Sequence, residues 1–381
     1  MMMEEGYPER LLLNLLEIYS PSGKEKEIST YLSKELECLG FRVRVDEVGN
    51  VEATLGEGRP SVLLCGHMDT VRGKIKTRKR GKVIFGRGAV DAKSPLAALI
   101  CGAKKYMEEG GKGKVTVLAV VDEEGKSRGM RHFLSRCEEK YDYAIFGEPS
   151  GAYALTVGYK GRILVRILCE TAPGHASAPM LFENAIYVAT RLIERLQRLG
   201  EDWSKGKGGD LFETPTLCVT RIRGGREDNT VPSFCEILVD VRVPPSMTIA
   251  EIKDKLMSII KEFKLREERA NVKLEFLDEN EPYLENEQSL LVRSFLESIR
   301  EVTGRDGRLS RKTGTADVND FVRKFKISSV VYGPGNSKLD HTPIENVSIR
   351  EYLDSIAIIT NVLKKLSSSW TEISGREGVR S

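Results

Sequence analysis

The chain has 381 residues, of which 40% are hydrophobic and 30% are charged. This length is large for one hydrophobic core and comfortable for two domains, and the composition is that of an ordinary globular protein with a heavily charged surface. The net charge is only +3, from 59 basic and 56 acidic side chains, which argues against a nucleic-acid partner. The seven cysteines form no CxxC pair, so we expect reduced thiols and a cytoplasmic location.

The first twenty residues place an acidic pair ahead of a short apolar stretch. A secretory signal would begin with basic residues, so the spacing of Leu12, Leu15, Leu16 and Tyr19 predicts an amphipathic helix over residues 8–20 instead. The sequence has no run of 18 or more apolar residues, and we therefore expect no membrane association.

Helices and strands alternate over the next part of the chain. After a helix at 24–39 we expect strands in FRVRVDEVGNVEATL and SVLLCG, a helix with Ser94 as N-cap, a strand in KVTVLAVV, a helix in RGMRHFLSRC and a strand in YDYAIFG. The strands are rich in Val, Ile and Leu. This pattern predicts an α/β fold in which helices cover both faces of a mostly parallel sheet.

The pattern changes near Gly158. Alternating strands in GRILVRILCE, TPTLCVTRIRGG and SFCEILVDVRV accompany two helices, at about 183–199 and 248–265. We expect residues 158–283 to form an inserted α+β domain, and residues 1–157 together with 284–381 to form the main domain. The α/β pattern then returns, with a helix from Ser289, a strand in ISSVVYG, a final helix at about 349–367 and a loosely held polar end.

Candidate metal ligands follow several of the predicted strands. They are His67 and Asp69 after SVLLC, Asp91 after GRGAV, Asp122, Glu123 and Glu124 after KVTVLAVV, Glu148 after YDYAIFG, and His341 after VVYGPGNSKLD. Each alone has an ordinary structural explanation, such as a solvated face or a helix start. In open α/β sheets, however, ligand sites lie outside the carboxyl ends of the strands, and imidazoles and carboxylates suit divalent cations. The joint pattern therefore predicts a metal site.

Two His, one Asp and two Glu would suit two metal ions that share a carboxylate. Paired ions clamp a carbonyl and activate a water between them. Of the neighbours Glu123 and Glu124, one can bind metal while the other takes the proton from the water. Asp69 would then orient the imidazole of His67 through its second ring nitrogen.

Nine motifs now point to a family. GHMDTV, GRGAVDAKSPLAA, VVDEEGKSRG, FGEPSG, GHASAP, DNTVP, DVRVP, TGTAD and HTPIEN occur in this order and span nearly the whole chain. Together they resemble the dinuclear zinc amidohydrolases, which include acetylornithine deacetylase, succinyl-diaminopimelate desuccinylase, aminoacylase and glutamate carboxypeptidase. The resemblance implies a catalytic domain of the zinc-exopeptidase type and, at 158–283, a lid or dimerisation domain.

The resemblance also implies a role for each candidate in a site that holds two ions of Zn²⁺ or Co²⁺. Asp91 would bridge the ions, His67 and Glu148 would complete the shell of one ion, and Glu124 and His341 that of the other. Glu123 would be the general base and Asp69 the orienting carboxylate.

Further roles fall on the insert and on the loop near residue 314. His175 would stabilise the oxyanion, commonly across a dimer, so we expect a homodimer. Asn229 and Arg242 would bind substrate, and Gly314 with Thr315 would hold its carboxylate. Many relatives have Gly-Gly in place of Ser94-Pro95 and Ser in place of Ala316; neither change removes a ligand, but Ala316 alters the carboxylate pocket.

Within the family, the chain is similar to the branch that releases lysine or ornithine from an amino-group carrier protein. There the α-amino group is amide-linked to the terminal glutamate of a small acidic carrier. The basic run at residues 72–82 would suit such a partner, although a solvated hairpin explains the run equally well.

Other functions stay open at this point. A deacetylase of free N-acetylornithine or N-acetyl-lysine, or a desuccinylase, would use the same residues. A non-catalytic dimeric binding protein on the same fold would have no reason to keep Glu123. A two-metal phosphoesterase would not explain the motifs of the insert.

Overall fold

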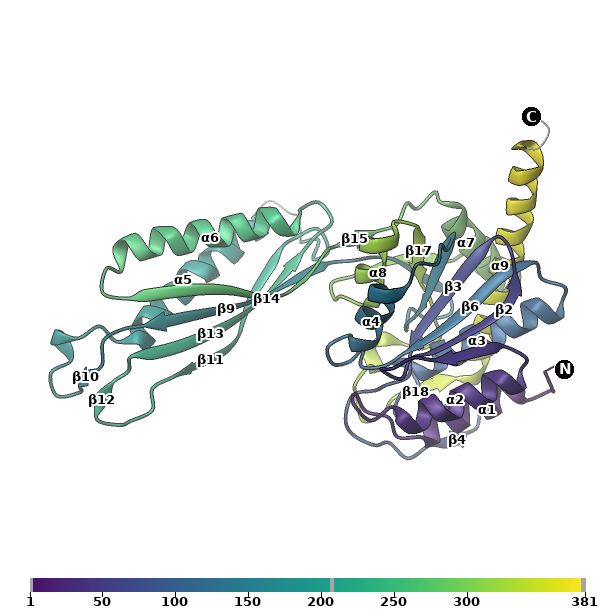
Figure 1. Ribbon diagram of the computed structural model, residues 1–381, viewed down its shortest axis with the longest axis horizontal. Helices are drawn as coiled ribbons and strands as arrows, with labels where there is room; N and C mark the ends of the chain where they lie inside the picture. The colour runs from purple at the N-terminus through teal and green to yellow at the C-terminus, as the bar shows by residue number, and fades with distance from the viewer. Residues whose placement is uncertain (1–2, 206–208, 378–381) are drawn as a thin grey trace. The chain divides into compact units, whose positions relative to one another are not determined.

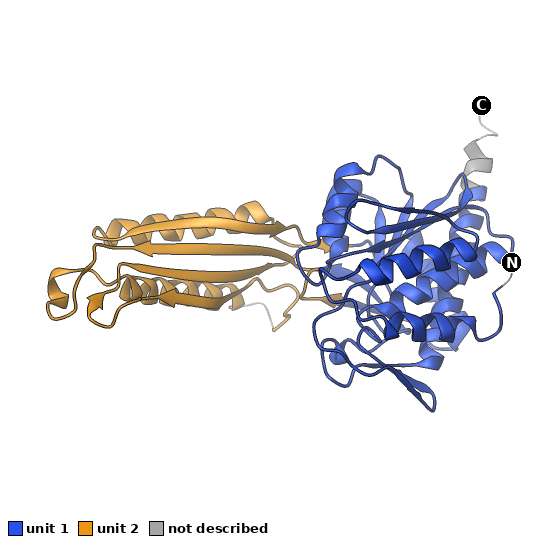
Figure 2. Cartoon of the chain, turned by 60° about the horizontal axis from the view of Figure 1, so that its bottom comes forward, with its two compact units in different colours: residues 1–158, 285–310, 316–381 blue, residues 159–284, 311–315 orange. Residues whose placement is uncertain are grey.

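The computed structural model describes residues 3–205 and 209–377 of the chain. The chain divides into two compact units, which Figure 2 colours separately. Unit 1 consists of Met1–Gly158, Glu285–Ser310 and Ala316–Ser381, and unit 2 consists of Tyr159–Leu284 and Arg311–Thr315. The loop that carries Gly314 and Thr315 thus belongs with unit 2.

The main sheet has nine strands among the described residues, and all of them except β15 lie wholly or partly in unit 1. Its order is β1-β2-β6-β3-β7-β17-β8-β15, with β16 paired to β8. The strands are β1 (Arg42–Val45), β2 (Val51–Glu57), β3 (Ser61–His67), β6 (Gly113–Val120), β7 (Tyr143–Gly147), β8 (Ala154–Tyr159), β15 (Tyr283–Leu284), β16 (Arg308–Lys312) and β17 (Ser328–Val331). The central strands β6, β3, β7 and β17 are parallel, so their carboxyl ends share one edge.

Helices cover both faces of this sheet (Figure 1). They are α1 (Tyr7–Glu17), α2 (Lys26–Cys38), α3 (Lys93–Glu108), α4 (Arg128–Arg136), α7 (Leu290–Thr303), α8 (Asp317–Phe325) and α9 (Ile349–Glu377). One apolar core joins α1, α2, α3, α7 and α9 to residues such as Val62 and Leu64 of β3. On the other face α4 packs against α8, whose Phe321 ring lies 5.3 Å from that of Phe146. The predicted α/β fold is confirmed.

Three local expectations need correction. Helix α3 begins at Lys93, so Ser94 is not its N-cap, and the Ser94 hydroxyl instead donates to the Ala89 carbonyl (2.7 Å). Helix α8 was not expected, although its apolar residues Val318, Phe321, Val322 and Phe325 recur at helical spacing. Helix α9 continues beyond residue 367 to Glu377, and only residues 378–381 of the expected loose end lie outside the described residues.

Unit 2 contains a four-stranded antiparallel sheet in the order β11-β13-β9-β14. The strands are β9 (Gly161–Glu170), β11 (Thr216–Gly224), β13 (Phe234–Val243) and β14 (Asn271–Asn280), with helices α5 (Ala185–Ser204) and α6 (Ile249–Arg266) packed on the sheet. Alternate residues of β9 and β13 are buried, and these side chains form the second apolar core with the two helices. A short pair, β10 (Gly174–His175) with β12 (Thr230–Val231), adjoins η1 (Pro179–Leu181).

A small three-stranded sheet lies within unit 1. Strand β5 (Val83–Phe85) pairs on one side with β18 (Asn346–Ser348) and on the other with β4 (Arg78–Arg80), which is part of the exposed basic run. Among the described residues, no helix is both long and apolar enough to span a membrane.

Candidate active site

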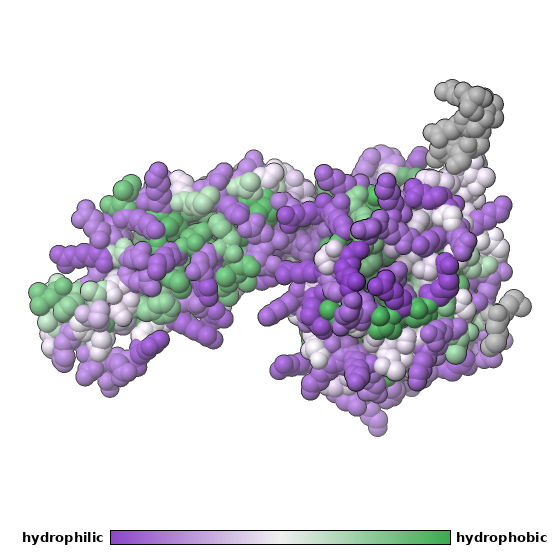
Figure 3. Space-filling model, in the orientation of Figure 1, coloured by the Kyte–Doolittle hydropathy of each residue, from purple (hydrophilic) through white to green (hydrophobic). Residues whose placement is uncertain are grey.

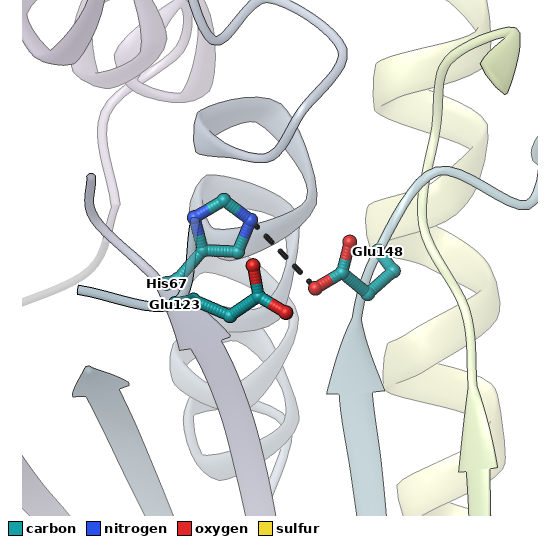
Figure 4. A group of neighbouring side chains, drawn as sticks. All are labelled: His67, Glu123 and Glu148. Atoms are coloured by element: carbon teal, nitrogen blue, oxygen red, sulfur yellow. Dashed lines mark ion pairs between the residues drawn. The ribbon is translucent and has the colours of Figure 1, made fainter. Parts of the chain in front are cut away.

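A first group of candidate ligands lies at the carboxyl edge of the main sheet. His67 ends β3, Glu148 follows β7, and Glu123 follows β6. Figure 4 shows the Glu123 carboxylate between the other two side chains. One ligand atom of each lies within 4.8 Å of those of the others, and Nε2 of His67 is 3.7 Å from Oε1 of Glu148. We call these three residues the deep cluster, because His67 is buried.

A second group, the outer cluster, consists of Asp91, Glu124 and His341, whose ligand atoms also lie within 4.8 Å of one another. Nε2 of His341 is 2.9 Å from Oε1 of Glu124 and 3.0 Å from Oδ2 of Asp91. The His341 side chain is 52% exposed, and its φ of +62° is a conformation that non-glycine residues rarely adopt. Such conformations gather at functional sites, where surrounding contacts hold them.

Asp91 connects the two clusters. Its Oδ1 atom lies 3.2 Å from Nε2 of His67, while its Oδ2 atom lies 3.0 Å from Nε2 of His341. One carboxylate oxygen therefore faces each histidine. This is the arrangement that the predicted bridging role requires, and it arises because the segment before α3 meets the carboxyl ends of β3 and β6.

Asp69 organises the segment that carries both glutamates. The backbone amides of Glu123 and Glu124 donate to its two carboxylate oxygens at 3.0 and 3.2 Å, and the Ser22 hydroxyl donates at 2.7 Å. Nδ1 of His67 lies closer to the Asp69 carbonyl oxygen (3.0 Å) than to its carboxylate (3.5 Å). The orienting contact predicted from the sequence is thus made chiefly by the backbone of Asp69, and its carboxylate holds the Glu123–Glu124 turn.

The protonation balance of the site favours a cation. Burial opposes the ionisation of Asp91, but hydrogen bonds with His341 and His67 lower its pKa. The hydrogen bond to Asp91 raises the pKa of His341 to about 9, and burial raises the pKa of Glu124 to about 7. Burial also raises the pKa of Glu123 well above its ordinary value. Metal ions favour ionised carboxylates and neutral imidazoles, so divalent cations would stabilise the charge gathered here, and the donor set fits them.

Two neighbours of the site were not predicted. Ser22 reaches Asp69 because Pro21 and Thr70 form a bridge between distant parts of the chain, for which the sequence carries no signal. Asp317, at the start of α8, is 5% exposed, and neither carboxylate oxygen has a hydrogen-bond partner among the described residues. Burial raises the pKa of Asp317 to about 7. The unexpected helix explains why this carboxylate was missed.

The candidates in unit 2 lie at opposite ends of its sheet. The pairing of β10 with β12 sets His175 opposite Thr230, and the Ala176 amide donates to the Asn229 carbonyl (2.9 Å). Both His175 and Asn229 are exposed. Arg242 lies near the far end of β13, where its Nε donates to Oδ1 of Asp240 (2.6 Å).

The loop with Gly314 and Thr315 belongs to the Arg242 end. Val243 pairs with Gly161 in the sheet, and the amide of the preceding Lys160 donates to the carbonyl of Lys312 (3.1 Å). From Phe234 to Arg242, β13 advances eight residues, or roughly 26 Å at strand spacing. Within one chain, His175 and Asn229 are therefore not brought together with Arg242.

Sequence comparison establishes the family. The model of the family described as "Peptidase family M20/M25/M40" matches residues 63–365 of this chain. These residues include every member of the deep and outer clusters. The chain therefore belongs to this family of hydrolases, and the family predicted from the motifs is confirmed. Its metallopeptidase members agree with a site for divalent metal.

Several relatives are similar over almost their whole length. A protein of Sulfurisphaera tokodaii named "[LysW]-lysine/[LysW]-ornithine hydrolase" is 32% identical, with 94% of this chain and 95% of that protein covered. A protein of Saccharolobus solfataricus with the same name is 32% identical over 90% of this chain and 91% of its own. A relative from Pyrococcus horikoshii, named provisionally for the same activity, is 37% identical over 96% of this chain and 99% of its own.

Solved structures share the fold. A tripeptidase from Staphylococcus aureus superposes with a TM-score of 0.79 at 22% identity, covering 97% of this chain and all of that one. An M20 family metallo-carboxypeptidase from Sulfolobus solfataricus gives a TM-score of 0.76 at 19% identity, covering 96% and 100%. At these identities the likeness concerns the fold alone.

Proposed function

We propose that this protein is a metal-dependent amide hydrolase that releases lysine, ornithine or both from a carrier protein. The observation that carries the hydrolase chemistry is the convergence of the deep and outer clusters on the shared carboxylate of Asp91. The names of the relatives support the carrier-linked substrate. The seven cysteines are free, which supports a reducing compartment such as the cytoplasm.

Two divalent ions, Zn²⁺ or Co²⁺, would be held by the imidazoles and carboxylates of the two clusters. His67, Glu148 and Asp91 would hold one, and Glu124, His341 and Asp91 the other. Bound there, the ions would polarise the substrate carbonyl and lower the pKa of a water. Glu123, the remaining member of the deep cluster, is left to act as the base.

The chain's own groups handle the proton. A buried Glu123 with a raised pKa is a stronger base than an exposed carboxylate, so it can accept a proton from the attacking water and return it to the leaving amine. Asp69 fixes the backbone position of Glu123, because its carboxylate accepts a hydrogen bond from the Glu123 amide. A fixed backbone keeps the Glu123 carboxylate in hydrogen-bond reach of the reacting water.

The oxyanion would be stabilised by His175 of a second copy. Within unit 2, His175 and Asn229 lie at the end opposite Arg242, so one chain cannot direct both ends at a single carbonyl. Met180 and Leu181 are 76% and 68% exposed at the β10 end, and Figure 3 shows apolar side chains gathered there. We propose a two-fold homodimer joined through unit 2, in which His175 and Asn229 serve the partner's site while Arg242, Gly314 and Thr315 serve their own.

The basic run would dock the acidic carrier. Its side chains Arg72, Lys74, Lys76, Arg78, Lys79, Arg80 and Lys82 are all exposed. Lys79 pairs with Glu9 and the Arg78 guanidinium lies over the Phe85 ring, whereas the other five have no ion-pair partner among the residues described. Unpaired cations at a surface attract an acidic partner over a distance set by ionic strength.

One comparison tests the proposed function. Purified protein is assayed on carrier-linked lysine, carrier-linked ornithine, free acetyl-lysine, acetylornithine and succinyl-diaminopimelate, before and after metal removal by a chelator. We expect a preference for the carrier-linked substrates, and loss of all hydrolysis without metal until Zn²⁺ or Co²⁺ is restored. Equal rates on free acylated substrates would favour the deacetylase alternative, and full activity of verified metal-free protein would refute the metal mechanism.

A further inference from the structure

A glutamate four residues beyond His341 lies in the interior of unit 1. Glu345 is 0% exposed and directly precedes β18. Strand β18 pairs with β5, with Asn346 opposite Phe85, and the Gly86 amide donates to the Glu345 carbonyl oxygen (3.3 Å). This pairing brings residue 345 alongside the segment Gly86–Asp91, although about 255 residues separate the two in sequence.

The Glu345 carboxylate binds the donors of that segment. Its Oε1 atom accepts hydrogen bonds from the amides of Val90 (2.8 Å) and Asp91 (2.9 Å), and the Gly88 amide lies 3.1 Å from both oxygens. The Arg87 guanidinium donates to Oε2 at 2.9 Å. Buried amides need partners, and hydrogen bonds to an ionised acceptor are roughly twice as strong as neutral ones. One buried carboxylate therefore fixes the backbone up to and including residue 91.

Asp91 stands at the end of this braced segment, and its two carboxylate oxygens face His67 and His341. The segment 341–345 thus supplies a member of the outer cluster and also holds the residue that both clusters share. We propose that Glu345 is a positioning residue that sets the place of Asp91 and thereby the affinity of the site for divalent metal. This inference rests on the proposed metal centre.

A matched carboxylate elsewhere in unit 1 provides the control. Asp46, between β1 and β2, accepts hydrogen bonds from the amides of Val48 (3.0 Å), Gly49 (2.9 Å) and Asn50 (2.9 Å) and from the Asn50 side chain (2.8 Å). Like Glu345, it gathers three amides and one side-chain donor. In the part of the chain that the structure describes, no hydrogen bond or ion pair joins Asp46 to a member of either cluster.

The test compares metal binding by wild type, Glu345→Gln and Asp46→Asn as full-length proteins. Zn²⁺ affinity is measured by competition with a chromogenic chelator, and the ligand field is followed by the visible spectrum of Co²⁺-loaded protein. Metal-free thermal unfolding measures the purely structural cost of each change. In Glu345→Gln one carboxylate oxygen becomes an NH2 group, which presents hydrogens either to the Arg87 guanidinium or to the amides of Val90 and Asp91, so the segment must shift to relieve that contact.

We expect Glu345→Gln to bind Zn²⁺ about 10- to 100-fold more weakly and to change the Co²⁺ spectrum, the scale known for residues that support metal ligands. Asp46→Asn should unfold at a lower temperature yet keep wild-type affinity and spectrum. Unchanged metal binding in Glu345→Gln, or equal weakening in both variants, would overturn the positioning role. If wild type itself bound no metal, the proposed function would fail and not only this inference.

A second variant covers the case in which Glu345→Gln does not fold. Glu345→Asp keeps the charge but draws the carboxylate back by about 1.5 Å, one C–C bond. We expect it to fold and to bind Zn²⁺ more weakly than wild type and more tightly than Glu345→Gln, where that can be measured. Wild-type affinity in Glu345→Asp, or failure of both variants to fold, would show a structural role alone and overturn the inference.

Discussion

The candidate residues of unit 1 converge, whereas those of unit 2 diverge. In unit 1, side chains from the ends of three strands and two loops form two clusters, and Asp91 faces a histidine of each. In unit 2, His175 and Asn229 lie beyond the Phe234 end of β13, whereas Arg242 lies roughly 26 Å from that end along the strand.

This difference concerns how many copies of the chain a complete site needs. The candidate ligands of unit 1 lie close enough together to bind metal ions within one chain. The candidate residues of unit 2 lie at two ends of that unit, so they cannot act on the same substrate bond unless a second copy of the chain supplies the residues of one end. We therefore expect metal binding to be a property of the single chain and catalysis to be a property of the pair.

The largest expected effect tests the convergence in unit 1. Glu123→Gln should keep both ions and lose turnover by about 10²–10⁴-fold, because a positioned base is worth that much and the amide cannot take a proton. Glu124→Gln should instead lose metal, since its Oε1 atom faces His341. Turnover is measured under saturating substrate, and metal content by elemental analysis.

The reverse outcome is informative, because a ligand atom of Glu123 lies within 4.8 Å of those of His67 and Glu148. Metal loss in Glu123→Gln together with metal retention in Glu124→Gln would exchange the two roles.

The next effect tests the divergence in unit 2. His175→Ala should lower turnover by about 10²–10³-fold, since removal of one oxyanion donor costs about 2.7–4 kcal/mol, and should leave metal content unchanged. Random mixing of His175→Ala with Glu123→Gln subunits should restore up to about a quarter of wild-type activity, because a two-fold heterodimer contains one intact site.

A variant at Asn229 should behave like His175→Ala, because Asn229 lies beside His175 at the same end of unit 2. Mixing it with Glu123→Gln subunits should therefore restore activity as well. Verified heterodimers without activity, or a fully active monomer, would contradict catalysis across the dimer.

A third prediction contrasts Asp317, a buried carboxylate in unit 1 whose oxygens accept no close hydrogen bond from the described residues, with a paired carboxylate in unit 2. The pKa of Asp317 rises from 3.8 to about 7, so between these pH values the folded state holds a proton that the unfolded state has lost. The stability of wild type should therefore fall as pH rises through this window. At pH 8, Asp317→Asn should be more stable than wild type by about 2–4 kcal/mol, and the gain should vanish near pH 4.

Urea unfolding of metal-free protein at both pH values measures this difference. Asp240→Asn is the matched change in unit 2, and it should destabilise, because Asp240 contacts both Arg162 and Arg242 at 2.6 Å. A loss of stability in Asp317→Asn at pH 8 would mean that its carboxylate is ionised and supported in the fold.

The smallest expected effect concerns docking of the carrier at the basic run, which lies outside the candidate site residues of both units. Neutralising Lys76, Arg78, Lys79 and Arg80 together should raise KM for the carrier-linked substrate about three- to tenfold and leave kcat and the hydrolysis of free acylated substrate unchanged. Added salt should raise the wild-type KM in the same way and have less effect on the variant. A wild-type KM for the carrier-linked substrate that does not change with salt would refute the proposed electrostatic docking surface.

The sequence was enough to bring the candidate ligands together because the physics behind their placement is local. Parallel strands end at one edge, so residues that follow β3, β6 and β7 must meet there, and His67, Glu124 and Glu148 do lie at that edge. Glu345 and Ser22 escaped notice because they act through pairings between distant segments, which leave no period in either segment. The ends of unit 2 were equally hidden, since DNTVP and DVRVP are neighbours in sequence but β13 carries Arg242 away from Asn229.

The spacing between His341 and Glu345 has a consequence for reading genomes. Because one residue faces the metal site and the other holds Asp91, inserting or deleting a single residue between them would displace both at once, while β18 and the helix after it could still pair and pack. We therefore expect one short length change to be enough to abolish hydrolysis in a chain that retains the fold. On this ground we expect a histidine followed at the fourth position by glutamate to mark an active copy better than either residue alone.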